Sequence, residues 1–163
     1  MDERVQNLKT PEHCEIFARN ALAKDRADLA DQARMRAVQL RAAAYGAESQ
    51  AEIEALEAVY AYEETLPKKN GKRARASRTW QMIRRHGIIE AVEREVNRDA
   101  ETQGYTALVE LGFEEFAFEA VILRHPDVFS DAAVQKSEER LSEWTSREQK
   151  TSDDTSDKEI EAE

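Results

Sequence analysis

Glycine and proline divide this chain into segments, and each segment repeats apolar residues with the period of an α-helix. Only five Gly and three Pro occur in 163 residues, so few breaks separate long stretches without turn residues. Within those stretches apolar or small residues recur at spacings of three and four, which is typical of one buried helix face. Ala, Glu, Arg and Leu dominate, as they do in helices rather than in β-sandwiches or barrels. The sequence therefore predicts an all-α fold.

The N-terminal segment, residues 1–66, is predicted to begin with an antiparallel helical hairpin. Thr10 and Pro11 are the residue types preferred at an N-cap and at the first helical position. Asp25 is predicted to cap the second helix, and Gly46 to end it in the left-handed conformation that glycine favours. One face of the second helix carries mostly small residues, which would let two backbones approach closely: Ala30, Ala33, Ala37, Leu40 and Ala44.

A third helix completes this segment. Ser49 and Glu52 have the spacing of a capping box, in which each side chain accepts a backbone N–H from the other residue. Pro67 is predicted to stop this helix, because proline cannot continue the hydrogen-bond ladder. Residues 67–76 are then predicted to form a basic loop.

The C-terminal segment, residues 77–145, is predicted to be a cluster of short helices. Ser77 is predicted to cap the first of them, and Gly87 to break it from the next. Residues 116–123 are apolar on every side except at Glu119, so they are predicted to form the central buried helix. Ser130 is predicted to cap the last helix.

Residues 146–163 form an acidic tail. They carry seven carboxylates against three cations, and Ile160 is their only sizeable hydrophobic residue. Such a stretch cannot bury enough apolar surface to offset the entropy of ordering. The tail is therefore predicted to be disordered.

Charge is separated along the sequence. No carboxylate occurs between Glu64 and Glu90, yet eight of the 24 basic residues fall in that interval. Removing these eight charges from a chain of net −10 leaves −18 on the rest. This separation predicts a local anion site. The competing interpretation is a solvated loop whose cations pair with carboxylates of neighbouring helices.

Hydroxyl and aromatic side chains accompany these cations at the start of a predicted helix. Groups of these kinds hold phosphates and stack on bases. The predicted phosphate-binding residues are Lys68, Lys69, Lys72, Arg73, Arg75, Ser77, Arg78, Trp80, Arg84 and Arg85. The leading hypothesis is a non-enzymatic binding module that holds a phosphate-rich partner, DNA or RNA, without base-specific readout.

The alternative hypothesis is a protein–protein interaction adaptor. Its Ala-rich helices and acidic surface would dock another protein, and the basic loop would contact an acidic partner. A helix-turn-helix is disfavoured, because the recognition helix would present Glu90, Glu93 and Glu95 to the phosphates of DNA.

His86, His125 and Glu119 are the residues that an enzymatic interpretation would need. Each histidine follows an Arg at a predicted helix end, where the helix dipole favours cations, so a structural role is preferred to acid–base catalysis. Glu119 lies in an apolar run and must find a donor or have a raised pKa; an ion pair with Arg78, Arg84 or another Arg is preferred. No catalytic residue is assigned. With three His and one Cys, neither a metal site nor a cofactor is predicted.

The sequence also favours a cytoplasmic setting. Cys14 is the only cysteine, so no disulfide can form within the chain. The first residues have neither the basic region nor the apolar run of a signal peptide. No stretch approaches about 18 uncharged apolar residues, so no membrane contact is predicted.

Four short motifs carry a resemblance to a known family. They are Arg-Ala-Ser-Arg-Thr-Trp-Gln-Met-Ile (75–83), Arg-His-Gly-Ile (85–88), Gly-Tyr-Thr-Ala-Leu (104–108) and Phe-Glu-Ala-Val (118–121). Through them residues 70–130 resemble a family of small uncharacterised bacterial helical proteins, and the acidic tail lies outside the resemblance. The resemblance implies a bacterial cytosolic protein. No activity is known for that family, so no catalytic residue is implied.

Overall fold

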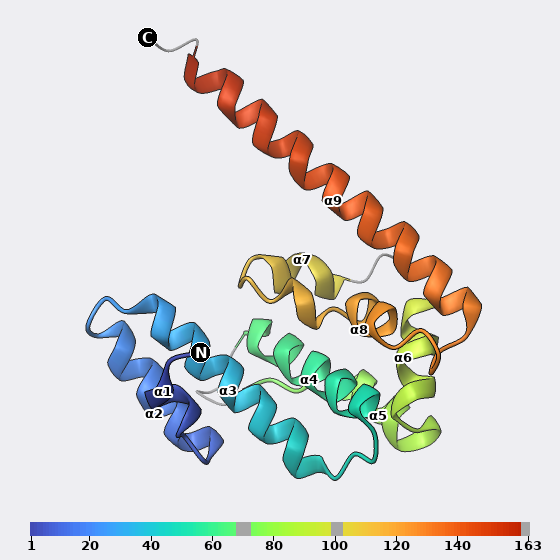
Figure 1. Cartoon of the computed structure of the whole chain (residues 1–163), viewed down its shortest axis with the longest axis horizontal. Helices are drawn as coiled ribbons and strands as arrows, with labels where there is room; N and C mark the ends of the chain where they lie inside the picture. Colours follow the sequence, from blue (N-terminus) through green and yellow to red (C-terminus); the bar gives the residue numbers. More distant parts are fainter. Residues whose placement is uncertain (68–72, 99–102, 161–163) are drawn as a thin grey trace.

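The computed structural model describes residues 1–67, 73–98 and 103–160, with the side chains of Gln103 and of residues 148–160 outside the description. Within these ranges the chain forms nine α-helices and one short 3-10 helix, and no strand, which confirms the all-α prediction. In chain order the elements are α1 (Glu3–Gln6), α2 (Pro11–Leu22), α3 (Ala27–Tyr45), α4 (Gln50–Thr65), α5 (Ser77–His86), α6 (Ile88–Val96), α7 (Gln103–Val109), η1 (Glu114–Phe116), α8 (Phe118–Arg124) and α9 (Asp131–Ile160). Figure 1 shows α4 in the middle of the molecule, with the α2–α3 hairpin to one side and α6 and α8 to the other.

The N-terminal hairpin forms as predicted. The Thr10 side chain caps α2 by accepting the His13 N–H at 3.2 Å, and Pro11 is the first helical residue. The small faces of α2 and α3 pack together, and α1, which the sequence analysis did not predict, covers the same cluster with Val5. The residues buried in this cluster are Val5, Ala18, Ala21, Leu29, Ala30 and Ala33.

The predicted cap at Asp25 is wrong. Asp25 has φ 53°, in the left-handed region, and lies in the turn that ends α2. Aspartate is one of the few residues other than glycine that tolerate this conformation. The N-cap of α3 is Arg26, which makes no side-chain capping bond and instead pairs with Asp28. At the other end of α3, Gly46 has φ 91° and ends the helix in the left-handed conformation, as predicted.

Helix α4 is the element around which the others pack. Its capping box is present: Ser49 Oγ accepts the Glu52 N–H at 3.2 Å, and Glu52 Oε2 accepts the Ser49 N–H at 3.1 Å. Ala55 and Ala58 face α6, α8 and α9, whereas Leu56 and Val59 face α5. The N-terminal segment defined from sequence therefore shares its core with the C-terminal segment.

Glu63 on α4 fixes the start of α5. Its side chain is buried, with 3% of the residue exposed. Glu63 Oε1 accepts the Trp80 Nε1–H at 2.6 Å and the Ala76 backbone N–H at 2.9 Å. The predicted cap at Ser77 is wrong, because Ala76 occupies the N-cap position and Ser77 is already helical. A carboxylate from another helix thus holds the residue that precedes α5, and no side chain caps the first turn itself.

The predicted single helix over residues 116–123 is divided in two. Ala117 is extended (φ −63°, ψ 145°), so η1 ends at Phe116 and α8 begins at Phe118. Phe116 belongs to one core cluster and Val121 to another, so the two elements pack against different parts of the core.

Ser130 caps α9 as predicted, with Oγ accepting the Ala133 N–H at 3.4 Å. Trp144 is the last buried residue among the side chains described, and its ring stacks on Tyr105 with 3.7 Å between centroids. The helix then continues to Ile160 and extends past the other helices (Figure 1). A helix without a packing partner is only marginally stable in water, so little free energy separates this geometry from the disorder predicted for the tail.

The Glu63 contact can be tested by substitution. Glu63→Ala leaves a buried indole N–H and a buried backbone N–H without an acceptor, so it should lower the free energy of unfolding by about 3 kcal/mol. Glu63→Gln keeps one acceptor oxygen and should lose less. Urea unfolding followed by tryptophan fluorescence measures both. Equal stability of Glu63→Ala and the native chain would contradict this role.

Candidate nucleic-acid interface

Helix α5 is strongly two-sided. Trp80 and Ile83 point into the core, where they pack against Leu56 and Val59 of α4. The side of α5 that faces solvent carries no carboxylate. We name this side the α5 basic face; it consists of Ser77, Arg78, Gln81, Arg84 and Arg85.

The three arginines of the α5 basic face have no ionic partner among the residues that the structure describes. Arg78, Arg84 and Arg85 are exposed, and none makes an ion pair or side-chain hydrogen bond with another residue in the described part of the chain. Three other exposed arginines are paired, Arg4 with Asp2, Arg26 with Asp28 and Arg94 with Glu90, whereas Arg19 of α2 makes no ion pair among the described residues. The α5 basic face is thus locally positive on a chain of net charge −10.

Arg73 has a structural position. It contacts Glu15 of α2 at 3.0 Å and Glu64 of α4 at 2.8 Å. Arg41 of α3 contacts the same two carboxylates at 3.1 Å and 2.7 Å. The four alternating charges tie the start of the 73–76 stretch to three helices. Arg73 therefore pairs with carboxylates of neighbouring helices, as the competing interpretation of the basic interval predicted.

Trp80 does not lie where a stacking base could reach it. The residue is 2% exposed, and its ring packs between Tyr45 and Tyr60, with centroids 5.5 Å and 5.2 Å away. Arg75 covers the indole, with Cζ 5.3 Å from the ring centroid. The burial of Trp80 does not fit its predicted role in stacking on a base. Arg75 is exposed and adds a fourth guanidinium beside the α5 basic face. Lys68, Lys69 and Lys72 lie outside the described residues.

The residues of the enzymatic interpretation are not brought together. His86 Nδ1 lies 4.0 Å from Glu90, at the junction of α5 and α6. His125 follows α8, and its Nε2 lies 3.1 Å from Glu54 Oε1 of α4. The angle at this contact does not satisfy a hydrogen bond. Glu119 is buried and pairs at 3.0 Å with Arg140 of α9, an arginine that the sequence analysis did not single out. Each of the three thus has a different charged partner on a different element.

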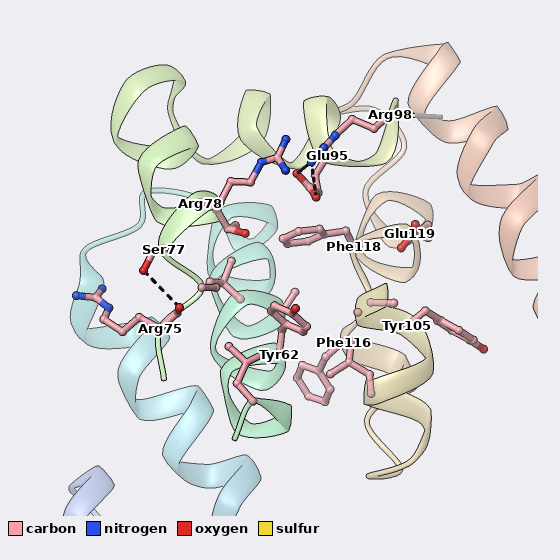
Figure 2. Close-up of a pocket in the computed structure, with 18 residues that line it drawn as sticks. Tyr62, Arg75, Ser77, Arg78, Glu95, Arg98, Tyr105, Phe116, Phe118 and Glu119 are labelled. Carbon is pink, nitrogen blue, oxygen red and sulfur yellow. Dashed lines mark hydrogen bonds and ion pairs between the residues drawn. The ribbon is translucent and has the colours of Figure 1, made fainter. Parts of the chain in front are cut away.

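A cavity of about 620 Å³ opens beside the first turn of α5. We name it the α5 pocket. Its walls come from α4, α5, α6, α7, η1 and α8, and Figure 2 shows aromatic side chains gathered on one side of it. Glu119 lines the α5 pocket, but neither His86 nor His125 does. The sequence assigned no role to Tyr62, Arg98, Gly104 or Phe118, which also line it. Gly104 and Phe118 begin two of the motifs quoted above, but a local motif does not show which separate segments meet in the fold.

Two kinds of feature, metal-ligating clusters and membrane-spanning helices, are absent from the described residues. No group of three or more His, Cys, Asp and Glu side chains in this part of the chain is arranged to hold a metal ion. None of its helices is both long and apolar enough to span a membrane.

No family model, curated protein or solved structure matches this chain. Function is therefore inferred from the residues and their geometry.

Acidic residues crowd the α4–α8 contact near His125. Burial alone would raise the pKa of Glu54, but Arg124, Gln50 and His125 together lower it. Glu57, one turn further along α4, makes no ion pair or side-chain hydrogen bond with a described residue, and Arg124 lowers its pKa only as a nearby charge. Burial, and then the neighbouring charge of Glu54, raise the pKa of Glu57.

The raised pKa of Glu57 predicts a pH-dependent effect of substitution. Folding favours the protonated form of Glu57, so its ionised form destabilises the protein above the folded-state pKa. The penalty disappears below the unfolded value of about 4.3. Glu57→Gln should therefore raise the free energy of unfolding at neutral pH and leave it unchanged at strongly acidic pH. Urea unfolding at both pH values measures this, with exposed Glu110→Gln as the control. A gain of equal size at both would show that ionisation of Glu57 is not the cause.

Proposed function

We propose that this chain binds DNA or RNA through the α5 basic face, as a non-enzymatic module that reads no base sequence. One observation carries the proposal. Three exposed arginines of one helix have no ionic partner in the described part of the chain, although carboxylates outnumber cations in the sequence as a whole. Arginine side chains with no internal partner remain available to phosphates, and their contacts with the backbone carry no base information.

The spacing along α5 suits a polyanion. Arg78 and Arg85 are two turns apart on the same side, a separation of about 10 Å along the helix axis. About three phosphates of one duplex strand rise over that distance. Arg84 widens the face, and Arg75 lies next to its start. Lys68, Lys69 and Lys72 belong to the proposal by sequence alone.

Arg73 and Trp80 are left out of the proposed interface. The guanidinium of Arg73 already faces two carboxylates, and a phosphate would have to displace them. The Trp80 ring is inside the core. Binding through α5 thus relies on charge rather than on stacking. From the single cysteine and the resemblance to bacterial proteins, we propose that the chain acts in the cytoplasm of a bacterium.

An acidic protein partner is the alternative occupant of the α5 basic face. The adaptor hypothesis also used the Ala-rich helices, but Ala30, Ala33 and Ala37 of α3 are buried inside the molecule. A partner protein would therefore have to use another surface. Guanidinium groups bind phosphate and carboxylate alike in bidentate geometry, so they do not separate the two occupants. Phosphates are favoured because no apolar residue lies on the α5 basic face, whereas the core of a protein interface is apolar.

The proposal predicts a salt-dependent loss of binding on substitution. Arg84→Gln combined with Arg85→Gln should weaken binding to duplex DNA and reduce the slope of log affinity against log salt by up to about 2, since each phosphate contact contributes about 0.9. The matched control is Arg4→Gln with Arg26→Gln, which removes the same charge from two exposed arginines that are already paired. Fluorescence anisotropy with labelled duplex, single-stranded DNA and RNA at several salt concentrations measures the slopes.

Two results would contradict the proposal. One is equal slopes for the α5 variant and the control, because net charge alone would then explain any binding. The other is displacement of DNA by polyglutamate at the same charge concentration, which would point to an acidic protein partner.

A further inference from the structure

The α5 pocket lies next to the α5 basic face and shares Arg78 with it. Its volume of about 620 Å³ falls within the range of pockets that enclose small organic ligands. The pocket combines a polar side at the start of α5 with an apolar side formed by α4, η1 and α8 (Figure 2). A ligand that fills it must therefore satisfy both sides.

The polar side of the pocket is suited to an anion. Helix α5 has no side-chain cap, and the N–H groups of Arg78 and Thr79 have no acceptor among the described residues. The Arg78 guanidinium also has no partner in the described part of the chain, and Figure 2 shows it pointing toward Glu95 and Arg98, whereas Arg75 points away. Two N–H groups at a helix start and one guanidinium are the donors that proteins use for phosphate.

The acidic residues of the pocket do not cancel this charge. Glu95 is paired with Arg98, its Oε1 lying 3.2 Å from the guanidinium. Glu119 is paired with Arg140. Each carboxylate is thus neutralised by its own arginine, and Arg78 supplies an unbalanced positive charge.

The apolar side of the pocket is aromatic. Tyr62, Phe116 and Phe118 line it, and Figure 2 shows their rings gathered on one side, although they come from α4, η1 and α8. Tyr105 also lines the pocket, but its ring is stacked on Trp144. Aromatic walls favour a flat ligand, because stacked and edge-on ring contacts stabilise it beyond the burial of its surface.

We propose that the α5 pocket binds a nucleoside monophosphate unit. The phosphate would lie at the first turn of α5, against the N–H groups of Arg78 and Thr79 and the Arg78 guanidinium. The base would lie among Tyr62, Phe116 and Phe118. This inference rests on the proposed function, because a strand that crosses the α5 basic face reaches the pocket at Arg78. The unit is either a free mononucleotide or the 5′-phosphorylated end of a strand.

Gly104 offers a way to close the pocket without touching the α5 basic face. It lies on α7, lines the pocket, and a Cβ built on it would point at the Tyr62 ring at 3.5 Å, an ordinary contact distance. Gly104→Leu should therefore extend a side chain into the pocket. Gly104→Ala adds only one methyl group and is the matched control.

The experiment measures anisotropy of a short 3′-labelled deoxythymidine strand with either a 5′-phosphate or a 5′-hydroxyl. The native chain and Gly104→Ala should bind the phosphorylated strand roughly tenfold more tightly, since two or more charge-assisted hydrogen bonds are added. Gly104→Leu should bind both strands equally, at the affinity of the hydroxyl strand. Competition by free adenosine monophosphate that removes the preference identifies a mononucleotide site, and its failure to compete assigns the site to strand ends.

Either of two outcomes would overturn the inference: no preference for the 5′-phosphate in the native chain, or the same preference in Gly104→Leu. Thermal unfolding checks that each variant is folded, and Phe118→Leu, which removes an aromatic wall but keeps its apolar character, provides the same test if Gly104→Leu is unstable. Failure of the proposed function is separate, because it would appear as loss of salt-dependent binding of the hydroxyl strand in the native chain.

Discussion

The buried carboxylate of Glu63 is the contact on which the arrangement of the candidate site depends. It accepts N–H groups from both Ala76 and Trp80, so it fixes the position and the rotation of α5 on α4. With Trp80 turned inward, helical geometry places Arg78 and Arg85 on the outer side, whereas Arg84, four residues after Trp80, lies beside the buried face and is still exposed. The same contact sets the start of α5 beside the pocket. One carboxylate thus orients both the exposed cations and the free N–H groups of the first turn.

Helix α4 brings the remaining parts together. It packs against α3 on one side and against α6, α7 and α8 on others, and it contributes Tyr62 to the pocket and Glu63 to α5. Residues 114–124 form two elements, η1 and α8, whose side chains contribute to different core clusters. Phe116 and Phe118, on either side of the extended residue Ala117, both line the pocket.

Arginine residues of the basic interval have different roles that their own sequence context does not reveal. Arg73 lies between Glu15 and Glu64, together with Arg41, and holds three helices to one stretch of chain. Arg84 and Arg85 face solvent and have no ionic partner within the described ranges. An arginine already paired with two carboxylates offers little to a phosphate, whereas an unpaired one retains its whole charge. The positive surface in the fold is therefore smaller than the basic interval of the sequence, because Arg73 is paired and does not contribute to it.

The sequence by itself determined the helices and most of their ends, because those signals act within a few residues: the Thr10 cap, the capping box of Ser49 and Glu52, and the breaks at Gly46 and Gly87. It also located the basic interval. Only the tertiary structure decided which of its cations are free, that Trp80 is buried, and that a pocket forms beside α5. The partners responsible, Glu15, Glu63 and Glu64, are distant in the chain and meet α5 and Arg73 only when the helices pack. Burial and ion pairing are properties of that packing, and a local pattern of residues does not specify them.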